Sequence, residues 1–309
     1  MRLEDQDVPG PKRDFVGYGR RLPKVVWPNG ANVALNIIVN YEEGSEYSIP
    51  AGDGRNEGMA EMSYVMPPAN RDLHAESIYE FGSRAGVMRL LRLFDEYGVK
   101  STFFAAAVAV ERNPEVGEWI RESGHDVAGH GWRWTDQWAM DRDEERRTIA
   151  AAIESLERTC GSRPTGWFSR YSASAHTREL LVEQGLLYDS DSFADDLPYF
   201  TEVGGKRHLL IPYTMVYNDG RFVLAQGFSS PPDFVETLKR GLDELLREGR
   251  AGYPKLMSIG LHPRWIGQAA RTSGLREFIE YALSLPDVWI ARREDIARWW
   301  IEHHESFER

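Results

Sequence analysis

Short apolar runs alternate along the chain with stretches whose apolar residues recur at helical spacing. The run at 33–40 is β-branched and apolar without polar alternation, which predicts a strand buried on both faces. Residues 86–97 instead place four apolar side chains on one helical face, and Gly98 follows as a stop signal. A strand followed by a helix is therefore the basic unit of the chain.

This unit recurs roughly seven or eight times. Further strands are expected at the start of 100–110 and at 126–129, 165–168, 187–190, 209–212, 256–261 and 288–291. Further helices are expected at 114–123, 141–160, 176–184, 232–248, 273–283 and 294–300. Such repeats form either a doubly wound sheet or a closed barrel, and the glycine-rich phosphate loop of dinucleotide binders is absent after the first strand. An α/β barrel is therefore favoured.

Two stretches lack this pattern. Residues 1–30 are rich in proline, glycine and charge, and we expect them to form an arm on the body or on a neighbouring subunit. The remaining residues, 31–309, have the length of one α/β barrel and are interpreted as a single catalytic domain. Within them, the weakly patterned segment 42–80 is long enough to be a functional loop or insertion.

Composition narrows the choice of partners. The chain has 37 basic and 48 acidic residues, and its net charge of −11 repels nucleic acid and anionic membrane surfaces. The longest apolar stretch, 103–110, is far shorter than the roughly 20 residues of a membrane-spanning helix. Cys160 is the only cysteine, and the first thirty residues have no apolar core typical of a secretory signal. We expect a cytoplasmic protein that acts on a small molecule.

Chemically active side chains come directly after predicted strands. In barrels the chemistry lies at the carboxyl ends of the strands, so residues in these positions are expected to share one cleft. The candidate catalytic residues are Glu42, Glu43, His130 and His262.

Each candidate suits a step of water-dependent bond cleavage. One glutamate could take a proton from water while the other holds a cation, a histidine or substrate N–H groups; the alternative is a solvated acidic turn. Neighbouring strand residues point to opposite faces, so both reach one pocket only if the chain bends, which Gly44 allows. His130 lies between two glycines, unlike a packed core histidine, and His262 suits a general acid that protonates a leaving nitrogen.

Other polar and aromatic residues could hold the substrate. Arg133, Arg170 and Arg264 are permanently charged donors for a carboxylate, a ureido carbonyl or a neighbouring acid. An acid-rich loop after the strand at 187–190 could orient an arginine or histidine, and for most of its members a plain Asx-rich turn is an equal alternative. The residues expected to contact substrate are Trp134, Arg133, Arg170, Asp195 and Asp196.

Taken in order, these residues resemble the polysaccharide deacetylase (NodB homology) superfamily, from Asn40 to about Trp300. The resemblance implies a distorted (β/α) barrel of about seven units, with Glu42 as the base and Glu43 as a metal ligand. The superfamily's His-x-x-x-His pair of metal ligands reads His130-Gly-Trp-Arg-Trp134 here. Because an indole has no lone pair for zinc, one ligand is missing.

Within the superfamily, five phrases look like the metal-independent allantoinase branch associated with urate catabolism. This implies no cofactor and a homo-oligomer such as a tetramer; any metal would be held by Glu43 and His130. The segment 168–176 differs from the glycine- and threonine-containing loop expected of those allantoinases, which leaves the identity of the substrate open. The five phrases are 40–44, 79–86, 130–134, 195–199 and 258–262.

We therefore expect a hydrolase of carbon–nitrogen bonds other than peptide bonds, opening a small cyclic ureide or imide such as allantoin. The carbonyl of such a ring is more electrophilic than an acyclic acetamide and needs less help from a Lewis acid. One alternative is a metal-dependent N-deacetylase of polysaccharides or small molecules, with Glu43, His130 and a third ligand such as Asp191 or Glu42 on zinc. A second alternative is a barrel that binds a ligand without hydrolysing it.

Overall fold

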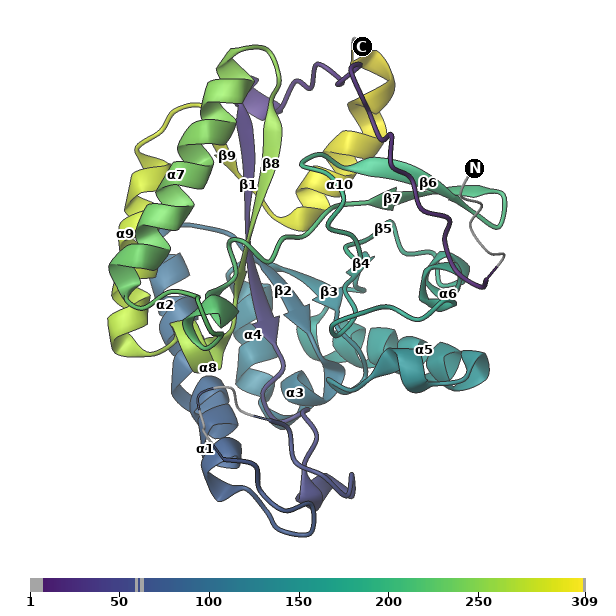
Figure 1. Ribbon diagram of the computed structural model, residues 1–309, viewed down its shortest axis with the longest axis vertical. Helices are drawn as coiled ribbons and strands as arrows, with labels where there is room; N and C mark the ends of the chain where they lie inside the picture. Colours follow the sequence, from purple (N-terminus) through teal and green to yellow (C-terminus); the bar gives the residue numbers. More distant parts are fainter. Residues whose placement is uncertain (1–7, 59–60, 62–63, 308–309) are drawn as a thin grey trace, which may run out of the picture.

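A curled β-sheet forms the centre of the protein (Figure 1). The computed structural model describes residues 8–58, 61 and 64–307. The strands are β1 (Val33–Tyr41), β2 (Thr102–Ala105), β3 (Asp126–Gly129), β4 (Gly166–Trp167), β5 (Tyr188–Asp189), β6 (Tyr199–Val203), β7 (Lys206–Leu210), β8 (Lys255–Leu261) and β9 (Val288–Ile290). The α-helices are α1 (Leu73–Phe81), α2 (Val87–Tyr97), α3 (Ala107–Arg112), α4 (Pro114–Glu122), α5 (Arg142–Cys160), α6 (Thr177–Glu183), α7 (Pro231–Arg250), α8 (Pro263–Ile266), α9 (Ala269–Leu283) and α10 (Arg293–His303).

The strands lie in the order β6-β7-β5-β4-β3-β2-β1-β8, and β9 pairs with the first residues of β1. All of these pairs are parallel except β6 with β7. Helices α7 and α9 pack side by side against the β1 and β8 side of the sheet (Figure 1). Parallel strands with covering helices confirm the predicted α/β class.

Strand β1 separates two apolar layers, and all nine of its residues are buried. Its odd-numbered residues, from 33 to 41, join the cluster between the sheet and the outer helices, whereas Ala34 and Ile38 join the cluster inside the curl. Asn36 is also buried, and its Nδ2 donates to the Ala291 carbonyl at 2.8 Å. Burial on both faces explains why the sequence shows an unbroken apolar run rather than alternation.

The sheet is a curled half-barrel, because its strand order among the described residues ends at β6 on one side and at β8 on the other. Single contacts cross the seam between these sides. Asn218 forms an isolated parallel bridge with Gly260, and the Leu256 N–H donates to the Asp196 carbonyl at 2.9 Å. The predicted distorted barrel is therefore confirmed, with one seam that no continuous ladder closes.

Arg293, the first residue of α10, fills this seam from inside. Its side chain is completely buried, and its guanidinium donates to Ser190 Oγ at 2.8 Å and Ser258 Oγ at 3.0 Å. It also donates to the carbonyl oxygens of Ile211 and Pro212, each at 2.7 Å. Burial lowers the pKa of Arg293 to about 10. One side chain thus joins segments that follow β5 and β7 to the middle of β8.

Caps define the helix ends that the sequence indicates. The Asp141 carboxylate accepts the N–H groups of Asp143 and Glu144 at the start of α5, and Gly161 ends this helix with φ 77°. Gly98 ends α2 in the same way, with φ 64°. Both helices match their predicted ranges. No helix within the described residues is both long and apolar enough to cross a membrane.

The strand expected at the start of 100–110 is confirmed as β2, which ends at Ala105 before α3. Two other local expectations differ from the structure. The segment 42–80, interpreted as a functional loop or insertion, contains most of α1, whose apolar face is too small to show a clear helical pattern. Strand β6 was not expected, although the turn Gly204-Gly205, with φ 56° and 76°, is a hairpin signal that could have identified it.

The predicted arm is partly integrated into the body. Residues 1–7 lie outside the described residues. Further along, Val25 and Trp27 are buried in the inner apolar cluster. The Trp27 indole donates to the Lys255 carbonyl at 3.0 Å, and its ring centroid lies 5.8 Å from that of Trp300. The end of the arm therefore belongs to the core rather than to the surface.

We predict that Arg293→Met lowers the free energy of unfolding by about 3 kcal/mol or more, because methionine leaves buried oxygens of the seam without a donor. Urea denaturation measures the change. Arg298→Met is the matched control on the same helix, since the Arg298 side chain is 59% exposed, and it should change stability by less than about 0.5 kcal/mol. Equal effects of the two substitutions would show that the seam does not depend on Arg293.

Candidate active site

Three side chains meet where strands β1, β3 and β8 end. Glu42, His130 and His262 each follow the last residue of one of these strands. Glu42 Oε1 lies 3.2 Å from His130 Nε2 and 3.6 Å from His262 Nε2. His262 is the most accessible of the three, with 10% of its side chain exposed. The structure thus brings residues from distant parts of the chain into one cluster at the carboxyl ends of the strands, as the sequence predicts.

Both imidazoles are held by their other ring nitrogen. His130 Nδ1 lies 2.5 Å from the Phe168 carbonyl, which can only accept a hydrogen bond. Asp219 accepts from His262 twice, from Nδ1 at 2.6 Å and from the backbone N–H at 2.7 Å. The Nε2 atoms of both rings therefore face Glu42. Asp219 was missed in the sequence, because Asn218-Asp219-Gly220 looks like an ordinary turn; nothing local shows that it meets a histidine.

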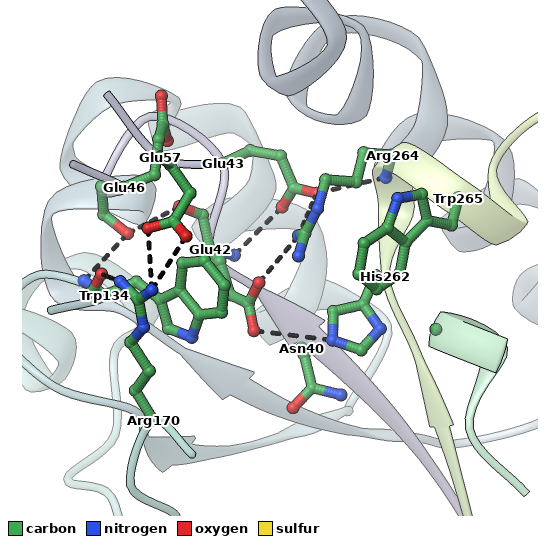
Figure 2. A network of polar contacts seen from close by, with 12 residues as sticks. Asn40, Glu42, Glu43, Glu46, Glu57, Trp134, Arg170, His262, Arg264 and Trp265 are labelled. Atoms are coloured by element: carbon green, nitrogen blue, oxygen red, sulfur yellow. Dashed lines mark hydrogen bonds and ion pairs between the residues drawn. The ribbon is translucent and has the colours of Figure 1, made fainter. Parts of the chain in front are cut away.

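Arg264 supplies the positive charge of the cluster (Figure 2). It is the second residue of α8, the helix that begins directly after His262, and it is only 1% exposed. Its Nη1 forms an ion pair with Glu42 Oε2 at 2.7 Å and lies 3.4 Å from Glu43 Oε1. The sequence does not distinguish Arg264 from Arg133 and Arg170. In the structure, Arg264 is the one of the three that lies between the two glutamates.

Glu42 and Glu43 both follow the last residue of β1, where the chain bends. The bend includes Gly44, with φ 87°. Glu43 Oε2 accepts the Glu42 N–H at 3.0 Å, and Glu43 Oε1 accepts the Arg264 N–H at 3.2 Å. Arg264 therefore links the two carboxylates.

The surroundings drive the pKa values of the two glutamates apart. Burial alone would raise the pKa of Glu42, but the charges of Arg264, His262 and His130 lower it to about 2. Burial raises the pKa of Glu43 to about 7, since Arg264 opposes it only in part and the charge of Glu42 adds to the effect. At neutral pH, Glu42 is a carboxylate, whereas Glu43 is divided between its protonated and its ionised form.

Trp134 occupies the position at which the superfamily motif has its second histidine. Its ring lies 4.0 Å from the Arg170 guanidinium carbon and 5.3 Å from that of Arg264, and Figure 2 shows it between them. Two cations on one indole are a favourable arrangement that a metal ligand could not provide.

These residues do not fit a catalytic zinc ion. The Trp134 indole has no lone pair to offer, and the Arg264 guanidinium, which already lies between Glu42 and Glu43, would repel a divalent cation. In the part of the chain that the structure describes, no group of three or more His, Cys, Asp or Glu side chains could hold a metal. Three protein ligands are the usual number for catalytic zinc.

The other two arginines each pair with an acid near the cluster. Arg170 Nη2 pairs with Glu57 Oε2 at 2.8 Å, and its Nη1 donates to the Trp134 carbonyl at 2.7 Å (Figure 2). Arg133 donates to both carboxylate oxygens of Asp53, at 2.8 and 2.7 Å. Both acids come from the segment 42–80. Arg170 and Arg133 therefore hold this segment over the site.

Asp195 and Asp196, expected to contact substrate, lie elsewhere. The Asp196 carbonyl accepts the Leu256 N–H near the start of β8, at the opposite end of that strand from His262. Asp195 Oδ1 accepts the Leu197 N–H at 3.1 Å, within its own turn. The acid-rich loop crosses the seam at the amino end of β8. For these two residues the structure supports the plain turn.

A turn of π-helix supports the cluster from outside the sheet. Residues 82–86 form this turn, η3 (Gly82–Gly86), between α1 and α2. A Cβ on Gly82 would lie 2.5 Å from Glu43 Cγ, and a Cβ on Gly86 would lie 2.2 Å from the Pro263 carbonyl oxygen. Two glycines thus let η3 pack directly under Glu43 and under the helix that carries Arg264. Single π-turns are often found at functional sites.

Comparison with known proteins places the chain in a family. The polysaccharide deacetylase family model matches residues 75–187. A Schizosaccharomyces pombe protein assigned by name to the polysaccharide deacetylases is 34% identical over 313 residues, which cover 94% of this chain and 98% of that protein. The chain therefore belongs to the polysaccharide deacetylase family.

Solved structures agree on the fold over almost the full length. A probable polysaccharide deacetylase from Pseudomonas aeruginosa PAO1 and PuuE allantoinase are each 44% identical to this chain, with a TM-score of 0.89. In both comparisons, 94% of this chain and 98% of the other chain are covered. A third structure, from Mycobacterium smegmatis, is 26% identical with a TM-score of 0.78. The chain is thus equally similar to proteins named for two different substrates.

Gly82→Ala is predicted to lower the free energy of unfolding by about 1 to 3 kcal/mol, because the new methyl group overlaps the Glu43 side chain. Thermal or urea denaturation measures the effect. In a Glu43→Ala background the overlapping atoms are gone, and the same substitution should be neutral or stabilising, since alanine favours a helix over glycine by about 1 kcal/mol. A similar cost in both backgrounds would contradict the contact.

Glu43→Gln is predicted to flatten the dependence of stability on pH. The folded protein keeps the Glu43 proton up to about pH 7, whereas the unfolded chain releases it near the ordinary value of 4.5. The free energy of unfolding therefore falls as pH rises between these values, by about 2 to 3 kcal/mol from this group. Urea titrations at pH 5 and pH 8 should show a smaller loss in Glu43→Gln, while Glu80→Gln, an exposed control, should follow the wild type.

Proposed function

We propose that this protein hydrolyses a carbon–nitrogen bond in a small cyclic ureide or imide, such as allantoin, without a catalytic metal. The observation that carries the proposal is the Arg264–Glu42 ion pair of 2.7 Å at the centre of the cluster. A guanidinium there supplies positive charge for a developing oxyanion. The full-length similarity to PuuE allantoinase at 44% identity supports the same reaction.

The charges of the cleft favour a neutral substrate. Among the described residues, each of the three arginines at the site already pairs with an acid, so none is left to bind a substrate carboxylate. A ring amide has no charge to balance and presents N–H and carbonyl groups to these ion pairs. The pairs are Arg264 with Glu42, Arg170 with Glu57 and Arg133 with Asp53.

In this proposal, His262, held by Asp219, takes the proton from the attacking water. Glu42 is already paired with Arg264, so it is better suited to accept a hydrogen bond from the attacking water and to stabilise an imidazolium. Asp219 holds Nδ1 of His262, which leaves Nε2 to take the proton from water. This differs from the expectation that Glu42 is the base and His262 only the acid.

The reaction then needs one proton shuttle. Water adds to the ring carbonyl and gives one proton to His262 Nε2, while the carbonyl oxygen becomes an oxyanion. Donors from Arg264 stabilise this oxyanion, and one such donor contributes about 3 to 4 kcal/mol. When the carbon–nitrogen bond breaks, His262 returns the proton to the leaving ring nitrogen. The products are a carboxylic acid and a free N–H group on one open chain.

A ring amide also suits a site without a Lewis acid. A guanidinium donates hydrogen bonds to an oxyanion but does not lower the pKa of a bound water as zinc does. The carbonyl must therefore be reactive by itself, and the carbonyl of a cyclic ureide or imide is more electrophilic than that of an acetamide.

We expect His262→Ala and Glu42→Gln each to lower kcat/KM on a panel of allantoin, hydantoin and cyclic imides by at least about a hundredfold. His74→Ala and Glu80→Gln, both on the exposed surface of α1, are the controls and should keep full activity. The pH profile separates the roles: activity that persists down to about pH 3 would make Glu42 the base. Full activity in both site variants would eliminate the proposal.

The alternative is a metal-dependent deacetylase of sugars, which the names of several relatives favour, including a Helicobacter pylori peptidoglycan deacetylase that is 31% identical over half of this chain. Metal analysis of the purified protein, chelation, and assays on acetylated sugar oligomers distinguish the two. Stoichiometric metal whose removal abolishes deacetylation would favour the alternative. Saturable binding of ring amides with no turnover would instead favour a barrel without catalysis.

A further inference from the structure

Tyr171 has a backbone conformation that aromatic residues rarely adopt. Its φ is 53°, in the left-handed region, and the Ser172 N–H donates to the Arg170 carbonyl at 2.5 Å across it. Such a tight three-residue turn is strained for any residue with a side chain. Bulky residues keep it only where their surroundings require it, and such positions cluster at functional sites.

The turn places the Tyr171 ring beside Trp134 and Arg170. The ring centroid lies 5.6 Å from that of Trp134, at an interplanar angle of 60°, and 6.3 Å from that of Trp138. The Arg170 guanidinium carbon lies 4.6 Å from the Tyr171 ring. Trp134 is the indole beside Glu42, so this aromatic group borders the catalytic cluster (Figure 2).

Core packing does not explain the strain. Tyr171 is 65% exposed, so its contacts with two tryptophans and Arg170 leave most of its surface open to solvent. The other described non-glycine residues with positive φ are Asn29 and Gln226. Asparagine tolerates this region well, and Gln226 lies on an exposed loop, two residues before Phe228. Tyr171 is the bulkiest of the three and the one beside the site.

We propose that Tyr171 is a specificity-determining residue. Its exposed ring stands beside Trp134 at the approach to Glu42, where a flat substrate ring can lie against it, and it limits the size of substituents on that ring. Aromatic faces pack well against planar amides, and an exposed ring held in a fixed direction loses little freedom on binding. This inference rests on the proposed function, since it takes the substrate to be a cyclic amide.

Three substitutions separate the ring from the backbone strain. Tyr171→Gly removes both the ring and the strain, Tyr171→Ala removes the ring and keeps the strain, and Tyr171→Phe keeps both. We expect Tyr171→Gly to have a Tm about 2 to 4 °C above that of Tyr171→Ala. Despite this difference, both variants should lose the same kcat/KM for hydantoin, at least about tenfold and mainly through KM, while Tyr171→Phe stays close to wild type.

Selectivity is the decisive readout. In Tyr171→Gly and Tyr171→Ala, the ratio of kcat/KM for 5-benzylhydantoin to that for hydantoin should rise at least about tenfold. Gln226→Gly is the matched control, because it relieves a similar φ of 59° away from the site and should leave both kinetic constants unchanged. Kinetic losses that follow Tm, or an unchanged ratio in both variants, would overturn the inference.

The outcome can be distinguished from a failure of the proposed function. If the wild-type protein turns over no ring amide, the proposed function fails, and calorimetric titration with hydantoin and 5-benzylhydantoin replaces the kinetics. Affinity that depends on the Tyr171 ring would then still support the inference. Equal affinity in wild type and Tyr171→Ala, or no binding by either protein, would overturn it.

Discussion

The buried charge of Glu42 is the constraint on which the rest of the site depends. A carboxylate removed from water is stable only beside a compensating positive charge, and the Arg264 guanidinium provides it at 2.7 Å. This pairing requires helix α8 to dock tightly, which the bare backbones of Gly86 and Gly267 allow. The same pairing explains why an aromatic residue suits position 134, because the Trp134 ring contacts the guanidinium groups of both Arg264 and Arg170. The Arg264–Glu42 ion pair, the π-turn η3 and the Trp134 ring therefore depend on one another.

The open seam of the half-barrel is the second feature of the fold that depends on one buried arginine. Where a closed barrel would have a ladder of backbone hydrogen bonds, this protein has scattered contacts and the buried Arg293, whose planar donors reach carbonyl and hydroxyl oxygens from several strands. Neutral acceptors satisfy its hydrogen bonds, and its lowered pKa reflects the burial. The catalytic cluster gains a rigid support from this arrangement, since Arg293 joins the middle of β8 to the segments that follow β5 and β7.

The relatives of the chain are named for two different substrates, and the chemistry of the site favours one of them. Full-length relatives include a polysaccharide deacetylase by name and PuuE allantoinase. In the cluster, the Arg264 guanidinium lies beside both glutamates, and a guanidinium is not equivalent to a metal ion. A metal activates water and polarises a poor electrophile, whereas a guanidinium only donates hydrogen bonds and charge. A site that relies on a guanidinium instead of a metal ion is suited to more reactive carbonyls, which is why we favour a ring amide over an acetylated sugar.

The sequence alone determined the βα order, the buried strands and the placement of Glu42, His130 and His262 at strand ends, because periodicity and caps are local properties. It also showed that Trp134 cannot bind zinc, since that follows from the side chain itself. Only the tertiary structure decided which arginine pairs with Glu42, that Asp219 holds His262, and that the acid-rich loop lies at the other end of β8. These depend on which side chains meet once the sheet curls, and no local pattern encodes a contact between residues so far apart in the chain.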